Sequence, residues 1–139
     1  MSSTQEIKEI KTVYAGLETL YHTYFPKSEP YLIHDLLRRL KKNPNISPIY
    51  MVEVFTKPGV DSEAAKKYIF GKTGMVPAIY DKGTHYVTNQ KLTLEILKEI
   101  SESTDVLEVA GDYTGNITAR GSSHVHSDDC PLRDPDYAY

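Results

Sequence analysis

The sequence is poor in cysteine, since Cys130 is the only one among its 139 residues. A single thiol cannot close a disulfide within the chain, which excludes a disulfide scaffold. No apolar run is long enough to cross a bilayer, and no charged segment followed by an apolar one marks a leader. We therefore expect an intracellular protein with no membrane partner.

The chain also lacks a strong excess of charge and has no tryptophan. It carries 16 Lys and Arg against 19 Asp and Glu, for a net charge of −3. This balance does not favour nucleic acid, and we expect no nucleic-acid partner. Tyrosine is abundant, with 11 residues. Its ring packs while its hydroxyl stays in water, which suits half-buried positions and protein contacts.

Motifs that carry common chemistries are missing too. The sequence has no Gly-rich phosphate loop, no Glu-x-x-His pair and no supported Ser, His and Asp order. Three of the histidines, His22, His34 and His85, fall on different predicted elements. We interpret each as a surface or hydrogen-bonded histidine rather than a catalytic base.

The N-terminal segment allows two interpretations. Residues 4–15 are predicted to be a helix, because Ile7, Ile10, Val13 and Tyr14 share one stripe. Residues 17–25 are rich in Thr, Tyr and Phe and end before Pro26, which favours a strand. The alternative is that the stripe continues and the first 25 residues form one helix.

The remaining pattern is a regular alternation of elements. Helices are predicted over residues 30–42, 61–70 and 92–100, and strands over 49–55, 75–80 and 84–88. Ser28 is a candidate cap, and residues 81–83 form a hairpin turn. A short strand is possible at 106–109, and the chain beyond 111 has few large aliphatic side chains. We divide the chain into a domain at 1–103 and an extended C-terminal tail at 104–139.

The run Gly74-Met75-Val76-Pro77-Ala78-Ile79-Tyr80-Asp81-Lys82-Gly83, followed by the helix at 92–100, resembles the thioredoxin family. The resemblance covers residues 17–103. It implies an α/β fold with a thioredoxin-like central mixed sheet flanked by helices, preceded here by the N-terminal helix. It also implies a cis peptide bond before Pro77.

The catalytic part of that family is missing. Redox members carry Cys-x-x-Cys at the start of the first long helix, where the helix dipole favours a thiolate. The corresponding slot here is Ser28-Glu29-Pro30-Tyr31, which holds no sulfur. Dithiol oxidoreductase activity is therefore not expected, and we favour a protein that is not an enzyme.

The family's peptide-binding surface beside Pro77 is the feature that could carry over. The resemblance implies a peptide or protein-binding groove lined by Tyr24, Pro26, Ser28, Tyr31, Val76 and Pro77. The alternative is that these are ordinary half-buried packing residues. Our leading hypothesis is a non-catalytic module that binds other protein subunits, as a structural or assembly component of a larger complex.

One cluster has metal-ligand chemistry. His124, His126 and Cys130 could hold zinc, with Asp128 and Asp129 beside them. The His-x-His-x₃-Cys spacing matches no established motif, and a solvated tail or docking arm is the competing interpretation. The alternative function is an enzyme or metal-binding protein using these residues, or a single-thiol redox role for Cys130.

Overall fold

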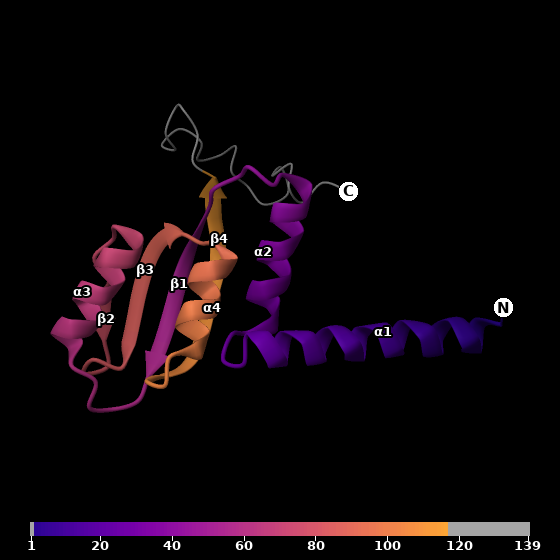
Figure 1. Ribbon diagram of the computed structural model, residues 1–139, viewed down its shortest axis with the longest axis horizontal. Helices are drawn as coiled ribbons and strands as arrows, with labels where there is room; N and C mark the ends of the chain where they lie inside the picture. The colour runs from indigo at the N-terminus through magenta and orange to yellow at the C-terminus, as the bar shows by residue number, and fades with distance from the viewer. Residues whose placement is uncertain (1, 117–139) are drawn as a thin grey trace.

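The computed structural model describes residues 2–116, which form a two-layer α/β fold (Figure 1). The described part contains four helices and one four-stranded sheet. In chain order the elements are α1 (Ser3–Tyr24), α2 (Pro30–Lys42), β1 (Pro48–Thr56), α3 (Ser62–Thr73), β2 (Ala78–Tyr80), β3 (His85–Lys91), α4 (Leu94–Glu102) and β4 (Val106–Asn116). The expected α/β class is confirmed.

The strand order in the sheet is β2-β3-β1-β4, and all three pairings are antiparallel. Val52 of β1 stands opposite Thr88 of β3 on one side and Gly111 of β4 on the other. The units β1-α3-β2 and β3-α4-β4 interleave, with β3 between the strands of the first and β1 between those of the second. This is the split β-α-β connectivity.

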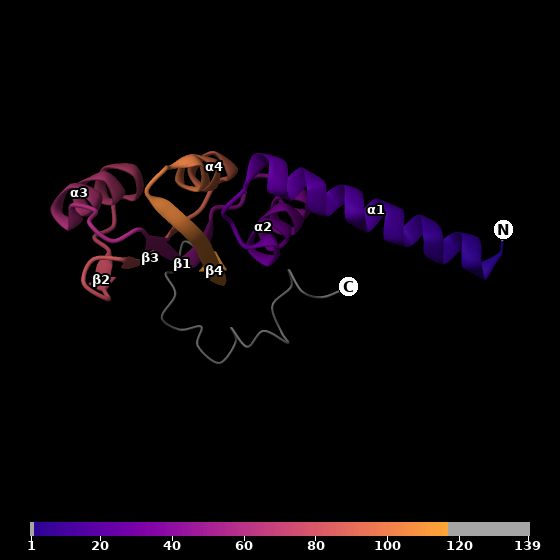
Figure 2. The same ribbon diagram turned by 90° about the horizontal axis from the view of Figure 1, so that it is seen from below.

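Helices α3 and α4 cover one face of the sheet, and α2 packs on the same side beside the edge strand β4 (Figure 2). The two-residue period of the strands decides which side chains meet them. Tyr50 and Val52 are buried under the helices, whereas Met51 and Glu53 point to the opposite, open face. The buried apolar cluster consists of Tyr21, Leu32, Ile33, Leu36, Tyr50, Val52, Leu92, Leu97, Val106 and Val109.

The strand expected at residues 17–25 is wrong, and the alternative of one long N-terminal helix is confirmed. α1 begins at the Ser2 cap, whose side chain accepts a hydrogen bond from the Gln5 amide. Thr19 and Thr23 donate their hydroxyls to the carbonyl oxygens four residues earlier, at 3.0 and 2.7 Å. These bonds satisfy the hydroxyls inside the helix, so the β-branched residues do not force a strand.

Side chains cap the N-termini of α3 and α4. The Asp61 side chain accepts hydrogen bonds from two amides of α3, and Thr93 accepts one from Ile96. The expected Ser28 cap is wrong, because the N-cap of α2 is Glu29 and makes no side-chain cap bond. Pro30 in the first turn supplies the pre-set backbone angle there.

The hairpin after β2 is confirmed, with positive φ angles of 52° at Asp81, 59° at Lys82 and 86° at Gly83. The expected cis bond before Pro77 is wrong, since no peptide bond among residues 2–116 is cis. Pro77 is buried and immediately precedes β2. A trans proline is tolerated at the start of an edge strand, because no neighbouring strand needs a hydrogen bond from its backbone nitrogen there.

The expected mixed sheet is wrong, because the four strands pair only in antiparallel fashion. The position beside β1 that we expected residues 17–25 to fill is taken by β4. β4 occupies residues 106–116 of the segment that we expected to be a tail. Its outer edge accepts and donates backbone bonds with residues 27–29, including Glu29 N to Val109 O at 2.8 Å. This short parallel bridge protects an edge that would otherwise be exposed.

A buried polar cluster fixes α2 on the sheet. The carboxylate of Asp35 accepts from Arg39 Nε at 2.9 Å and from the Tyr50 hydroxyl at 2.7 Å. The Arg39 guanidinium is fully buried and lies 3.2 Å from the ring centroid of Tyr113. Burial acts to raise the pKa of Asp35, but the hydrogen bonds from Tyr50 and Arg39 outweigh it and hold that pKa below its usual value.

Candidate functional site

The six residues of the expected groove lie at opposite edges of the sheet. Four of them, from Tyr24 to Tyr31, surround the junction of α1 and α2, where Ser28 bridges to Val109 of β4. The other two, Val76 and Pro77, immediately precede β2. Since β2 and β4 are three strand spacings apart, about 14 Å, the structure does not bring the two groups together. The residues are Tyr24, Pro26, Ser28, Tyr31, Val76 and Pro77.

The zinc candidates His124, His126 and Cys130 lie outside the described residues. The metal hypothesis therefore stays a prediction. Within residues 2–116, no group of three or more His, Cys, Asp or Glu side chains is placed to hold a metal ion.

The most exposed apolar surface in the described chain is on α1. The side chains of Ile10 and Val13 are each 66% exposed, and Ile7 and Tyr14 are also more than half exposed. Apolar residues recur along this helix at alternating steps of three and four. That spacing matches the a and d positions of a heptad repeat, which form the seam of a coiled coil. We call these residues the heptad stripe: Ile7, Ile10, Tyr14, Leu17, Tyr21 and Tyr24.

The protein itself covers one end of the heptad stripe. Tyr21, near the C-terminal end of α1, belongs to the core and is 7% exposed. The N-terminal part of α1 projects away from the sheet and the other helices (Figure 1). Most helical stability in proteins comes from packing of an amphipathic face, and the exposed apolar side chains of this part of α1 have no such packing within the described residues.

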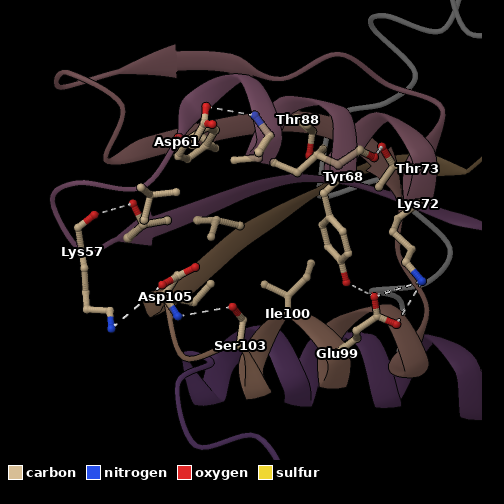
Figure 3. A pocket seen from close by; sticks show the side chains of 18 of the residues that line it. Lys57, Asp61, Tyr68, Lys72, Thr73, Thr88, Glu99, Ile100, Ser103 and Asp105 are labelled. Carbon is tan, nitrogen blue, oxygen red and sulfur yellow. Dashed lines mark hydrogen bonds and ion pairs between the residues drawn. The ribbon is translucent and has the colours of Figure 1, made fainter.

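A second feature is a cavity of about 980 Å³ between α3, α4 and the helix-covered face of the sheet (Figure 3). We call it the interhelix cavity. Its walls are largely aliphatic, because the alanines and Ile69 of α3 face the isoleucines of α4 across it. The apolar lining residues are Val54, Val60, Ala64, Ala65, Ile69, Ile96, Ile100 and Val106.

The strand β3 supplies a polar floor to the interhelix cavity. Tyr86, Thr88 and Gln90 alternate along β3 and are all buried, with Tyr86 1% and Gln90 3% exposed. The Thr88 hydroxyl donates to Gln90 Oε1. Tyr86 Oη and Gln90 Nε2 are buried side-chain atoms with no hydrogen-bond partner in the described residues.

Two helices are joined across the rim of this cavity. The Tyr68 hydroxyl on α3 donates to Glu99 on α4, and Lys72 lies 3.2 Å from the same carboxylate (Figure 3). Burial and the hydrogen bond to Glu99 raise the pKa of Tyr68 to about 12. The same bond and Lys72 hold the pKa of Glu99 below its usual value.

This rim contact predicts a loss of stability in alkaline solution. A raised tyrosine pKa adds stability that is fully present below the ordinary value of about 10. It is lost as pH rises through the folded value of about 12. We expect the urea midpoint to fall across this window, and to fall less in Tyr68→Phe. Tyr31→Phe on α2 is the matched control, and an equally steep fall in Tyr68→Phe would refute the assignment to Tyr68.

The open face of the sheet carries aromatic and acidic groups together. His85 stacks on Phe55 with ring centroids 4.4 Å apart, and its Nε2 lies 3.0 Å from Glu53. Glu108 and Asp112 of β4 stand opposite Phe55 and Met51 and so share this face. The aromatic rings resemble a stacking platform for bases, but the carboxylates around them would repel phosphate groups.

Comparisons with protein-family models, with curated proteins and with solved structures found no match. No helix within residues 2–116 combines the length and the apolar character needed to cross a membrane. The described residues form a two-layer α/β protein with a projecting amphipathic helix.

Proposed function

We propose that this protein is a non-catalytic assembly module in which α1 pairs with α1 of a second copy along the heptad stripe. One observation carries the proposal: α1 exposes a coiled-coil seam on a segment that projects from the fold. Pairing would remove the exposed apolar side chains of both copies from water. Each fully buried Ile or Val would contribute about 1.5–3 kcal/mol.

The charges beside the heptad stripe support a second copy as the occupant. With Ile7 at position a, Glu6 falls at g, and Lys11 and Glu18 fall at e. Two parallel α1 helices place Glu6 of each copy beside Lys11 of the other. Two antiparallel helices place Lys11 beside Glu18 instead. Either direction gives opposite charges across the seam, so the surface is complementary to itself.

The seam is wider than a strict two-position stripe. Val13 and Leu20 fall at g positions and are exposed apolar residues. An apolar a, d and g pattern suits helices that pack in a bundle as well as in a two-stranded coil. The proposal therefore extends to a paired α1 that docks in a larger protein assembly.

The open sheet face is a less suitable site for the proposed role. Its acidic residues Glu53, Glu108 and Asp112 do not favour a nucleic-acid partner. Its aromatic side chains also already contact each other and a carboxylate, since Phe55 stacks on His85 and His85 lies against Glu53. We therefore propose protein partners, and no nucleic acid.

The test compares two substitutions on the same helix. Ile10→Glu places a charge in the seam, whereas Thr12→Glu adds the same charge at position f, away from it. We expect the full wild-type chain and Thr12→Glu to have twice the chain mass in light scattering, and Ile10→Glu to have the mass of one chain. The expected weakening is roughly 3 kcal/mol or more per dimer, because each copy loses a buried isoleucine.

Two results would count against this interface. A wild-type chain that stays monomeric at high concentration refutes pairing with a second copy. A dimer that persists in Ile10→Glu places the interface elsewhere. Circular dichroism of the three proteins checks that each remains folded.

A further inference from the structure

The interhelix cavity has the size and lining of a small-molecule site. Its volume of about 980 Å³ lies within the range of ligand pockets, which are mostly apolar with a few placed polar groups. α3 forms one wall without burying any residue of its own, and Ala64 and Ala65 leave room beneath it. The cavity is distinct from α1, so it does not depend on the proposed pairing.

The floor of the cavity offers two hydrogen-bond donors. Tyr86 Oη and Gln90 Nε2 are buried without a partner, although buried polar groups are normally satisfied. Thr88 donates to Gln90 Oε1, which fixes the amide with its nitrogen left over. Burial and the charge of Asp61 raise the pKa of Tyr86, so its hydroxyl stays protonated and able to donate. A bound molecule would therefore supply acceptors.

The charges at the rim select against anions. Both lysines already pair with carboxylates, Lys72 with Glu99 at 3.2 Å and Lys57 with Asp105 at 4.0 Å. Glu102 pairs with Lys98 just outside the lining, and Asp61 caps α3, so the described rim offers an anionic ligand no lysine that is not already paired with a carboxylate. The charged lining residues are Lys57, Lys72, Asp61, Glu99, Glu102 and Asp105.

From these observations we propose that the interhelix cavity binds an uncharged, largely apolar small molecule with hydrogen-bond acceptors such as carbonyl oxygens. The aliphatic walls hold its apolar body. Tyr86 and Gln90 donate to its acceptors and orient it over β3. The competing account is that ordered water fills the cavity and satisfies both donors.

The test uses Nile red, an uncharged aromatic dye with one carbonyl acceptor, and follows its fluorescence during titration of the full chain. We expect saturable binding of one dye per chain. Ala65→Phe, which projects a ring into the cavity from α3, is expected to weaken it by about tenfold or more. The double variant Tyr86→Phe/Gln90→Met keeps the side-chain volumes and removes both donors, and is expected to weaken binding about tenfold. Ile10→Glu controls for dye bound to the heptad stripe and is expected to bind normally.

Thermal unfolding supplies a second readout for the same variants. Ala65→Phe is expected to leave the melting temperature unchanged or higher, because the new ring fills existing space. The double variant is expected to melt close to the wild-type temperature, because it removes two unpaired buried groups but also takes the Gln90 Oε1 acceptor from the buried Thr88 hydroxyl. A lower melting temperature for Ala65→Phe would mean that no such space exists, which overturns the proposal.

Several binding results would also overturn it. These are no saturable dye binding, binding that is as tight in Ala65→Phe as in wild type, or binding that is lost in Ile10→Glu. Equal affinity of the double variant would favour the water-filled account. An anionic naphthalene sulfonate that binds as tightly as Nile red would refute the selection for uncharged ligands. The oligomeric state is measured separately, so failure here leaves the α1 proposal intact.

Discussion

Replacing Asp35 with alanine is expected to lower the free energy of unfolding by about 3–5 kcal/mol. The carboxylate accepts from both Arg39 Nε and the Tyr50 hydroxyl inside the core. Arg39 is 0% exposed, so its guanidinium cannot turn to water when the carboxylate is removed. Urea denaturation measures the loss.

The matched control is an exposed ion pair with the same helical spacing. Glu102 pairs with Lys98 four residues earlier on α4, and both side chains are about half exposed. Glu102→Ala is expected to cost no more than about 0.5 kcal/mol. If Asp35→Ala costs as little as Glu102→Ala, the buried cluster does not anchor α2.

The same cluster has a predicted acid dependence. The pKa of Asp35 is held below its usual value in the folded state. Its contribution is therefore present above the unfolded carboxyl pKa and is lost as pH falls through the lower folded value. Wild type should lose stability in acid more steeply than Asp35→Ala, which has no such carboxyl to protonate.

Gly111→Ala is expected to have the second largest effect, a loss of about 1–3 kcal/mol. A Cβ at this position of β4 would lie 2.8 Å from the carbonyl oxygen of Met51 and 3.4 Å from Leu32 Cδ1. The closer contact is backbone in β1, which is held by strands on both sides and cannot easily shift. Urea denaturation again gives the cost.

Gly16→Ala makes the same substitution in α1 and is expected to raise the free energy of unfolding instead of lowering it. Among residues 2–116, nothing beyond the adjoining backbone of α1 lies within 4 Å of a Cβ at Gly16, which is inside that helix. Alanine is there expected to stabilise the helix by about 0.5–1 kcal/mol, because it reduces the entropy lost on folding. A neutral Gly111→Ala would mean that β4 does not pack as closely on β1 as described.

The elements with local signals could be predicted from the sequence. The Asp61 and Thr93 caps and the stripes of the helices that follow them are set within one or two turns of chain. Residues 17–25 carry both a helical stripe and strand-forming residues, and periodicity alone could not separate them. The full length of β4 is harder to predict, because four of its 11 residues are charged or polar and its pairing with β1 is distant in sequence.

The candidate sites were harder to predict for a related reason. The start of the heptad stripe, Ile7 to Tyr14, was recognised, but the sequence does not show whether the fold covers it. The interhelix cavity unites α3, α4 and β3, and Tyr68 and Glu99 at its rim are 31 residues apart. Its signal was the run Tyr86, Thr88 and Gln90 at alternating positions of one strand, which puts polar groups on the covered face.

The central claim is that two copies of α1 contact each other along the heptad stripe. The most direct measurement is an isotope-filtered NOE experiment on a mixture of labelled and unlabelled full-length chains. Our account predicts intermolecular signals from the methyl groups of Ile7 and Ile10 to the stripe residues of the other copy. Intermolecular signals confined to the open sheet face around Phe55, or none at all, would contradict it.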